Sequence, residues 1–280
     1  MSEDTGILDR AYAALHKCKY AEAAKDFNLL RRSGNSTASY IYGSLLATME
    51  DFRGADEIFD ELILSDSPEA KAYGMAGSAR MSRLRATRMF EKCQTINQKL
   101  TPKQIREFQR EFVGLKKGLE EALDEPLDCK HDVLNEYGIL LGLKASIAWY
   151  HEKKEPRLFT RAINKLEEAL VQDPSFTPAR NNIGMTYFDW ALLLPQDERK
   201  EKLALALENF NTALRMNSSY VESLINKGTV LCHLGRFSDA KEPFVEAARL
   251  NSYHTAKYVR KLGKEVMREI GIDKDCRVIK

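Results

Sequence analysis

The sequence carries almost no excess charge of either sign. Its 280 residues include 43 Lys and Arg against 41 Asp and Glu. A dedicated nucleic-acid-binding protein usually concentrates a strong basic excess on one face, so we expect no nucleic-acid partner. Glycine (15) and proline (8) are also few, and 44% of the residues are hydrophobic. This composition excludes collagen-like and low-complexity chains and supplies enough apolar residues for a packed core.

Paired cysteines and long apolar runs are missing as well. The five cysteines are odd in number, and no two stand in Cys-x-x-Cys spacing, which favours free thiols in a reducing compartment. The most apolar stretches, 137–150 and 188–194, are short or interrupted by charged residues and proline, whereas a membrane span needs about 20 apolar residues. The acidic first residues do not resemble a secretory signal. We therefore expect a cytoplasmic protein without membrane insertion.

What the sequence does contain is a short recurring pattern, an alanine followed four positions later by an aromatic residue or leucine. The six copies are Ala23/Phe27, Ala55/Phe59, Ala86/Phe90, Ala162/Leu166, Ala206/Phe210 and Ala240/Phe244. Another small or apolar residue follows three positions later in each copy, which is the spacing of one helix face. Most copies are preceded, twelve positions before the alanine, by a small residue: Ala11, Gly43, Gly74 or Gly228. The pattern predicts helical hairpins whose two helices approach closely.

The clearest copy runs from Val221 to His254 and has the order and spacing of a 34-residue repeat. The chain therefore resembles the tetratricopeptide repeat (TPR) family, whose signature describes such a hairpin. Lys227 and Ser252 depart from it, standing where the family has leucine and proline. The resemblance implies an all-α fold, an α-solenoid of about six TPR-like hairpins with a C-terminal capping helix.

Two long intervals between copies suggest where the repeats are irregular. The stretch from Thr101 to Asp124 predicts a helix with a capping-box start that has no place in the repeat pattern. One extra helix should break the stack. We predict four parts: an N-terminal array of about three repeats (1–99), a connecting helix and linker (100–131), a C-terminal array of about three repeats with two lengthened hairpins (132–251), and a capping helix with tail (252–280).

Two details of these repeats are also predicted. The third repeat should be a hairpin with Arg80, Arg83, Arg85 and Arg88 at its tip and on its second helix. These arginines form either a solvated face or a docking patch for an acidic partner. In the fifth repeat the excess residues predict a longer hairpin tip, from Leu192 to Lys202.

The family resemblance implies that the first helix of each hairpin lines a concave groove. In the C-terminal array the groove positions hold Asn181, Asn182, Met185, Asn226, Thr229 and His233, and Arg260 has the same register in the next unit. In the N-terminal array they include Tyr12, Tyr40 and Lys71. A row of asparagines can pair with a peptide backbone; alternatively, asparagine is simply common at this position in the family.

We therefore expect a non-enzymatic scaffold or adaptor that binds a peptide or protein segment in this groove; the sequence does not identify the partner or the oligomeric state. A cochaperone is the alternative function. Asn226 and Arg260 match two of the five carboxylate-clamp residues that hold the acidic tails of heat-shock chaperones, but Asn181, Met185 and Ala256 do not match. An RNA-binding repeat would need a basic groove.

Catalytic and cofactor signatures are absent, including the P-loop, dinucleotide-binding and zinc-protease motifs. Cysteine and histidine are neighbours at three places: His16/Cys18, Cys129/His131 and Cys232/His233. Each pair offers two ligands where a structural zinc site needs four, and the pairs belong to repeats far apart in a quasi-linear stack. We expect no catalytic residue, no cofactor and no metal site.

Overall fold

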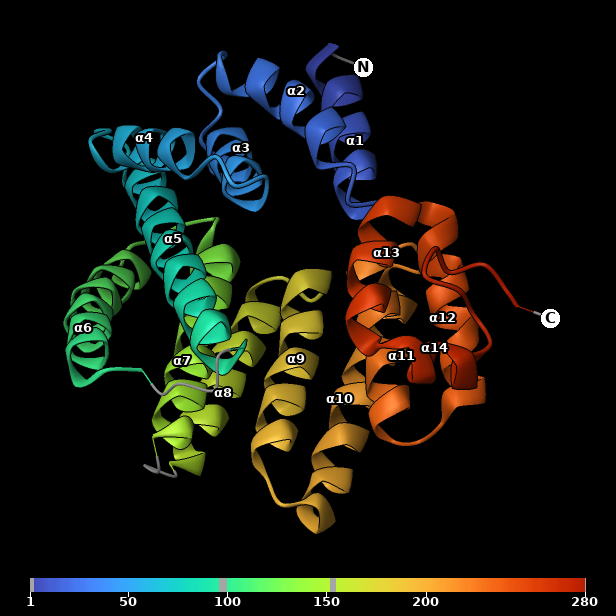
Figure 1. Ribbon diagram of the computed structural model, residues 1–280. Coiled ribbons are helices and arrows are strands. Elements are labelled where there is room, and N and C mark those ends of the chain that lie inside the picture. The colour runs from blue at the N-terminus through green and yellow to red at the C-terminus, as the bar shows by residue number, and fades with distance from the viewer. Residues whose placement is uncertain (1–2, 96–99, 152–154, 280) are drawn as a thin grey trace. The chain divides into compact units, whose positions relative to one another are not determined.

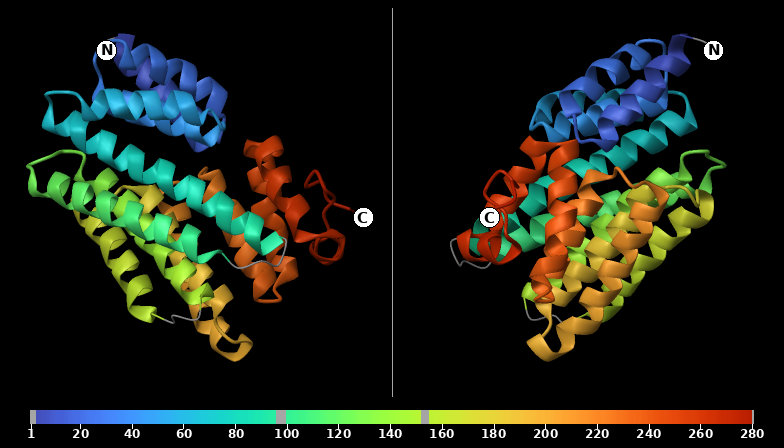
Figure 2. Two further views of the ribbon diagram at one scale, coloured as in Figure 1. Left: turned by 60° about the vertical axis from the view of Figure 1, so that its left-hand side comes forward. Right: turned by 90° about the vertical axis from the view of Figure 1, so that its right-hand side faces the viewer.

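The structure is a computed structural model that describes residues 3–95, 100–151 and 155–279. Contacts divide the chain into two compact units: unit 1 comprises Met1–Ala11 and Tyr20–Phe176, and unit 2 comprises Tyr12–Lys19 and Thr177–Lys280. This division coincides with neither predicted array boundary. Successive helices pack as hairpins (Figures 1 and 2), and the predicted fold class is confirmed.

Within its described residues, unit 1 contains seven complete helices and the first part of an eighth. They are α1 (Glu3–His16, divided between the units), α2 (Tyr20–Arg31), α3 (Ser36–Thr48), α4 (Phe52–Ile63), α5 (Pro68–Thr95), α6 (Pro102–Asp124), α7 (Lys130–Tyr150) and α8 (Pro156–Gln172). Pro156 is the first residue of α8, a position that suits proline because its missing N–H would have no partner in the first turn.

The recurring alanines and aromatic residues form the interlock inside the hairpins. Ala55 and Phe59 are completely or almost completely buried. The Phe59 ring lies between two glycines of neighbouring helices: an added Cβ would stand 2.7 Å from this ring at Gly43 and 2.1 Å from it at Gly77. Only glycine fits such an approach. Phe90 and Cys93 belong to the third copy, but their side chains lie outside the described residues.

The third repeat differs from the prediction. Helix α5 continues from Pro68 to Thr95 without a turn, because residues 78–88 include no glycine or proline and favour helix throughout. Helix α6 packs against α5 and against α7 and takes the place of the second helix. Its capping box at Thr101 and Gln104 forms as predicted. Helix α6 thus pairs with α5, whereas the sequence predicted an extra helix that breaks the stack.

Unit 2 contains the remaining helices and the turn after α1. They are α9 (Thr177–Leu193), α10 (Gln196–Met216), α11 (Val221–His233), α12 (Phe237–Leu250), α13 (Ser252–Val259), the 3₁₀ turn η1 (Arg260–Leu262) and α14 (Lys264–Ile270). Only Leu194 and Pro195 separate α9 from α10. The excess residues of the fifth repeat therefore lengthen both helices, and the prediction of a longer hairpin tip is wrong.

The C-terminal cap consists of two pieces. Gly263 adopts φ 86°, a left-handed conformation that ends the first piece and redirects the chain. Helix α13 packs on α12 and α14 packs on α12 as well. Asn251 caps α13, accepting a hydrogen bond from the backbone N–H of His254 at 2.9 Å.

Candidate functional site

Helices α9 and α11 of unit 2 run side by side in the same direction. Asn226 Nδ2 donates to Asn181 Oδ1 at 3.0 Å, and the rings of Phe188 and His233 meet edge to face with centroids 5.1 Å apart. Both contacts join positions separated by the same number of residues, 181 to 226 and 188 to 233, so the two helices are parallel and aligned. Their outward sides form one continuous surface.

Asn181 has a different role from the one predicted. Its side chain is only 3% exposed and accepts hydrogen bonds from Ser223 Oγ at 2.9 Å and from Asn226 Nδ2. It therefore joins α9 to α11 and is not placed to meet a ligand. Asn226, which is half-buried, uses one of its two donors in the same joint. A polar side chain between two packed helices must be satisfied by a neighbour, which explains this arrangement.

The residues next to this joint remain accessible. We define the α9–α11 face as Asn182, Met185, Phe188, Asp189, Thr229 and His233, which are half-buried or exposed. Four of them recur at helical spacing along α9, so they share one side of it. The Thr229 hydroxyl donates a hydrogen bond to the Ile225 carbonyl at 2.9 Å. The face combines an adaptable thioether and an aromatic ring with polar groups, a mixture typical of protein interfaces.

The electrostatics of the α9–α11 face favour a cation. Asp189 is exposed to water along one side of α9, yet the helices around it remove part of its hydration and raise the pKa of its carboxyl to about 7. Loss of hydration and the charge of Arg199 lower the pKa of His233, so the imidazole is neutral at pH 7. Once Asp189 ionises, the face carries one carboxylate beside a neutral histidine.

Arg260 does not extend this face in the way predicted. It lies in η1, where its guanidinium pairs with the Asp275 carboxylate of the C-terminal tail at 3.0 Å. The exposed Arg260 side chain therefore has a partner in unit 2, Asp275, which lies outside the repeat pattern. Tyr12, predicted for the N-terminal array, belongs to unit 2, with its ring 6.2 Å from that of His16.

The corresponding helices of unit 1, α3, α5 and α7, are joined by charged groups. The Glu136 side chain is 1% exposed and accepts hydrogen bonds from Arg80 Nη1 at 3.2 Å and from Tyr40 Oη at 3.5 Å. Arg83 Nε lies 3.7 Å from its second oxygen. We call Tyr40, Arg80, Arg83 and Glu136 the Glu136 cluster. Glu136 Oε1 accepts both hydrogen bonds, and Oε2 is paired with Arg83 by charge at a distance too long for a hydrogen bond.

Two predicted residues of unit 1 can now be placed. Tyr40 is 5% exposed, donates to Glu136 and stacks on Tyr73 with ring centroids 5.0 Å apart. It is therefore a core residue, which corrects its prediction as a contact residue. Lys71 is exposed on α5 and stays a prediction.

Sequence reasoning missed the Glu136 cluster because it placed Arg80 and Arg83 at a hairpin tip. One signal was present: Glu136 interrupts the apolar run of α7, and a carboxylate in such a run requires a cationic partner. Arg85 and Arg88 pair instead with Asp56 and Glu50 on the surface, which agrees with the predicted solvated face.

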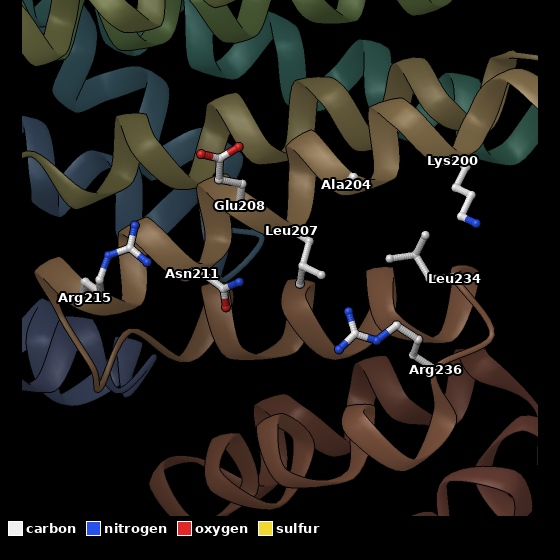
Figure 3. A pocket seen from close by; sticks show the side chains of 8 residues that line it. All are labelled: Lys200, Ala204, Leu207, Glu208, Asn211, Arg215, Leu234 and Arg236. Carbon is white, nitrogen blue, oxygen red and sulfur yellow. The ribbon is translucent and has the colours of Figure 1, made fainter.

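A second surface of unit 2 lies between α10 and the turn from α11 to α12 (Figure 3). It is an open hollow of about 560 Å³ that includes none of the predicted site residues. Its lining consists of Lys200, Ala204, Leu207, Glu208, Asn211, Arg215, Leu234 and Arg236. Arg236 is held by Asp239 at 2.6 Å. The hollow has mixed charges and no buried polar anchor, so it fits a specific ligand less well than the α9–α11 face.

Comparisons with known proteins found one family model and several solved structures that resemble this chain. Residues 114–234, less than half of the chain, match the family model described as the plant-specific mitochondrial import receptor subunit TOM20. No curated protein matches the sequence.

Three solved structures are similar. YrrB, a TPR protein with an unusual peptide-binding site, is 16% identical with a TM-score of 0.38, over 85% of this chain and 100% of that one. The human IFIT1 dimer with PPP-AAAA is 14% identical with a TM-score of 0.43, over 92% and 65%. The TPR2AB domain of yeast Sti1 in its pHSP90 complex is 12% identical with a TM-score of 0.34, over 98% of both chains.

The family match corrects one expectation. The predicted cytoplasmic localisation is wrong, because the matched family is a receptor subunit of mitochondria. That prediction depended on the unpaired cysteines, on the acidic first residues and on the lack of a hydrophobic span. Among the residues that the structure describes, no helix is both long and apolar enough to cross a bilayer.

Proposed function

We propose that this chain, a tetratricopeptide repeat protein by its helical hairpins, is a non-enzymatic adaptor that binds a peptide segment on its α9–α11 face. The observation that carries the proposal is the aligned pair α9 and α11. Their joint is closed by Asn181, Ser223 and Asn226, while the adjoining groups stay accessible. A preformed surface on two aligned helices can receive an extended or helical segment with an affinity of around micromolar, about 8 kcal/mol.

The chemistry of the face selects the class of peptide. Met185 and Phe188 offer apolar contacts, and Asp189 offers the negative charge for a lysine or arginine. The ligand that fits is an amphipathic segment with basic side chains. Mitochondrial targeting peptides are amphipathic, rich in arginine and poor in acidic residues. The match to an import receptor family over residues that include both helices supports this class.

The cochaperone alternative has less support. A clamp for an acidic tail needs charge-assisted donors that converge on a carboxylate. Arg260 is paired with Asp275, and Asp189 would repel an acidic tail. Binding of such a tail is therefore the outcome that would replace our proposal.

The experiment compares two fluorescent peptides titrated with the full chain. The first is a basic amphipathic 20-mer, with arginines and leucines at helical spacing; the second is an acidic peptide with a free C-terminal carboxylate. Fluorescence anisotropy should show saturable binding of the basic peptide only. Tighter binding of the acidic peptide, or no binding of either, would overturn the proposal.

A pair of charge reversals locates the site. Asp189→Lys should weaken binding of the basic peptide about tenfold, because it replaces an attraction by a repulsion. Asp60→Lys is the matched control: it makes the same change of charge at an exposed residue of α4 in unit 1 and should leave the affinity within about twofold. Circular dichroism confirms that both variants keep their helices. Equal effects of the two changes would mean that only net charge matters.

A further inference from the structure

Three potential metal ligands from distant parts of the sequence meet in unit 2. They are Cys18 in the turn after α1, Glu222 in the first turn of α11 and His254 in α13, and their ligand atoms all lie within 4.8 Å of one another. Sequence separation suggested that Cys18 and its neighbour His16 could gain no further ligand. That argument fails because Tyr12–Lys19 packs in the same unit as α11 and α13.

Neighbouring hydrogen bonds hold these side chains in place. Asn251 Nδ2 donates to the carbonyl of Lys17 at 2.8 Å, and Asn251 Oδ1 accepts from the backbone N–H of His254 at 2.9 Å. One asparagine therefore ties the residue before Cys18 to the backbone of His254. The third potential ligand, Glu222, is held by Tyr220, whose hydroxyl donates to Glu222 Oε2 at 3.0 Å.

Cys18 lies in the turn between the two helices of its hairpin. Its φ is 54°, a left-handed conformation that is uncommon for residues other than glycine, and its N–H donates to the Leu15 carbonyl at 2.8 Å. The side chain is 7% exposed. Glu50 and Gly235 adopt the same conformation at the corresponding turns of other repeats, so this backbone is the usual end of the first helix of a hairpin.

We propose that Cys18, Glu222 and His254 bind one Zn²⁺ ion, with water in the fourth position. A thiolate, an imidazole and a carboxylate are the donors that zinc takes, at about 2.3, 2.0 and 2.1 Å respectively. Tetrahedral ligation at these lengths brings the donor atoms to about 3.5 Å from one another, so small side-chain rotations close the site. Calcium and magnesium prefer an all-oxygen shell and are disfavoured.

The charges of the site balance on binding. The Cys18 thiol releases its proton to solvent as the sulfur–zinc bond forms, and the resulting thiolate and the Glu222 carboxylate together neutralise the ion. The neutral imidazole of His254 supplies a nitrogen lone pair to the ion. The ion would fasten the turn after α1 to the start of α11 and to α13, three segments joined in sequence only through the rest of the chain.

Zinc binding is tested on the metal-free full chain with Zn²⁺ alone, in competition with a chromophoric chelator. We expect one zinc per chain, submicromolar affinity and a melting temperature raised by several degrees. Co²⁺ in place of zinc should give the visible bands of a tetrahedral site and a sulfur-to-cobalt charge-transfer band. Less than a tenth of a zinc ion bound per chain, at zinc concentrations that saturate the chelator, would overturn the proposal.

Substitutions then identify the ligands. Cys18→Ser and His254→Gln should each weaken zinc binding at least 100-fold, and Cys18→Ser should remove the charge-transfer band. Cys232→Ser, which changes a half-buried free cysteine of α11, is the matched control and should retain both. If a ligand variant loses helix content, Glu222→Gln supplies the independent test, with binding expected to weaken about tenfold. Zinc binding that survives all three ligand changes would place the ion elsewhere.

Discussion

The two units use polar groups differently to join their repeats. In unit 1, α3, α5 and α7 meet at the Glu136 cluster, where a fully buried carboxylate faces two arginines. In unit 2, α9 and α11 meet through neutral amides and a hydroxyl. A buried charge needs partners close to it, so Tyr40, Arg80 and Arg83 are held at this joint. A neutral joint needs few partners and leaves the neighbouring α9–α11 face accessible.

The largest expected effect breaks the charged joint. Glu136→Ala should destabilise the protein by about 3–5 kcal/mol, because it leaves two guanidinium groups without their buried carboxylate. Denaturant unfolding measures the change. Glu121→Ala, which removes an exposed pair with Lys117 on the surface of α6, should cost less than about 1 kcal/mol. Similar losses for the two variants would mean that the buried cluster contributes no more than a surface pair.

The second prediction concerns close packing in the same unit. Gly77→Ala should cost about 2–3 kcal/mol, since its methyl group would enter the Phe59 ring. At Gly114 on α6, an added Cβ would have no neighbouring atom within 4 Å. Gly114→Ala should therefore stabilise the helix by about 1 kcal/mol. Thermal melts of both variants give the comparison. A Gly77→Ala protein as stable as the parent would show that the helices separate freely there.

Sequence alone predicted the hairpins and most of their interlock, because alanine and aromatic residues at helical spacing report packing that is local to one repeat. It failed for α5, since a helix of 28 residues and a hairpin have similar patterns when no glycine or proline marks the turn. Long-range partners were also beyond it: the pairing of Arg80 with Glu136, and the meeting of Cys18 with His254, depend on how repeats pack and not on any local spacing.

The third prediction concerns the pH dependence of stability that Asp132 causes in unit 1. Burial raises the pKa of Asp132, beside Glu136 on α7, to about 6. The pKa of this carboxyl is higher in the folded protein than in the unfolded chain, so its ionisation opposes folding. The free energy of unfolding therefore falls as the pH rises from about 4 to 6. Asp132→Asn should therefore add about 1–2 kcal/mol of stability at pH 7.5 and nothing at pH 4. Denaturant unfolding at both pH values would contradict this if the variant were less stable at pH 7.5.

A smaller effect is expected from the neutral joint of unit 2. Asn226→Ala removes one hydrogen bond to Asn181, which still accepts from Ser223, so the loss should be about 1 kcal/mol. The same denaturant measurement as for Glu136→Ala tests it. A loss as large as that of the charged cluster would remove the difference between the two joints.

The smallest prediction concerns ligand binding and pH. Because the pKa of Asp189 is about 7, the basic peptide should bind more tightly at pH 8 than at pH 6, by a factor of about 2 to 5, the range for an exposed ion pair. Asp189→Asn should abolish this pH dependence. Persistence of the dependence in Asp189→Asn would assign it to another group.

The most direct test of the central claim is photo-crosslinking of the basic amphipathic peptide to the full chain, followed by mass spectrometry of the attached residues. Our account predicts crosslinks to α9 and α11, around Met185, Phe188 and Thr229, and their loss in the presence of excess unlabelled peptide. Crosslinks concentrated on α3, α5 and α7 would contradict it, because they would show that the helices joined by the Glu136 cluster form the binding surface.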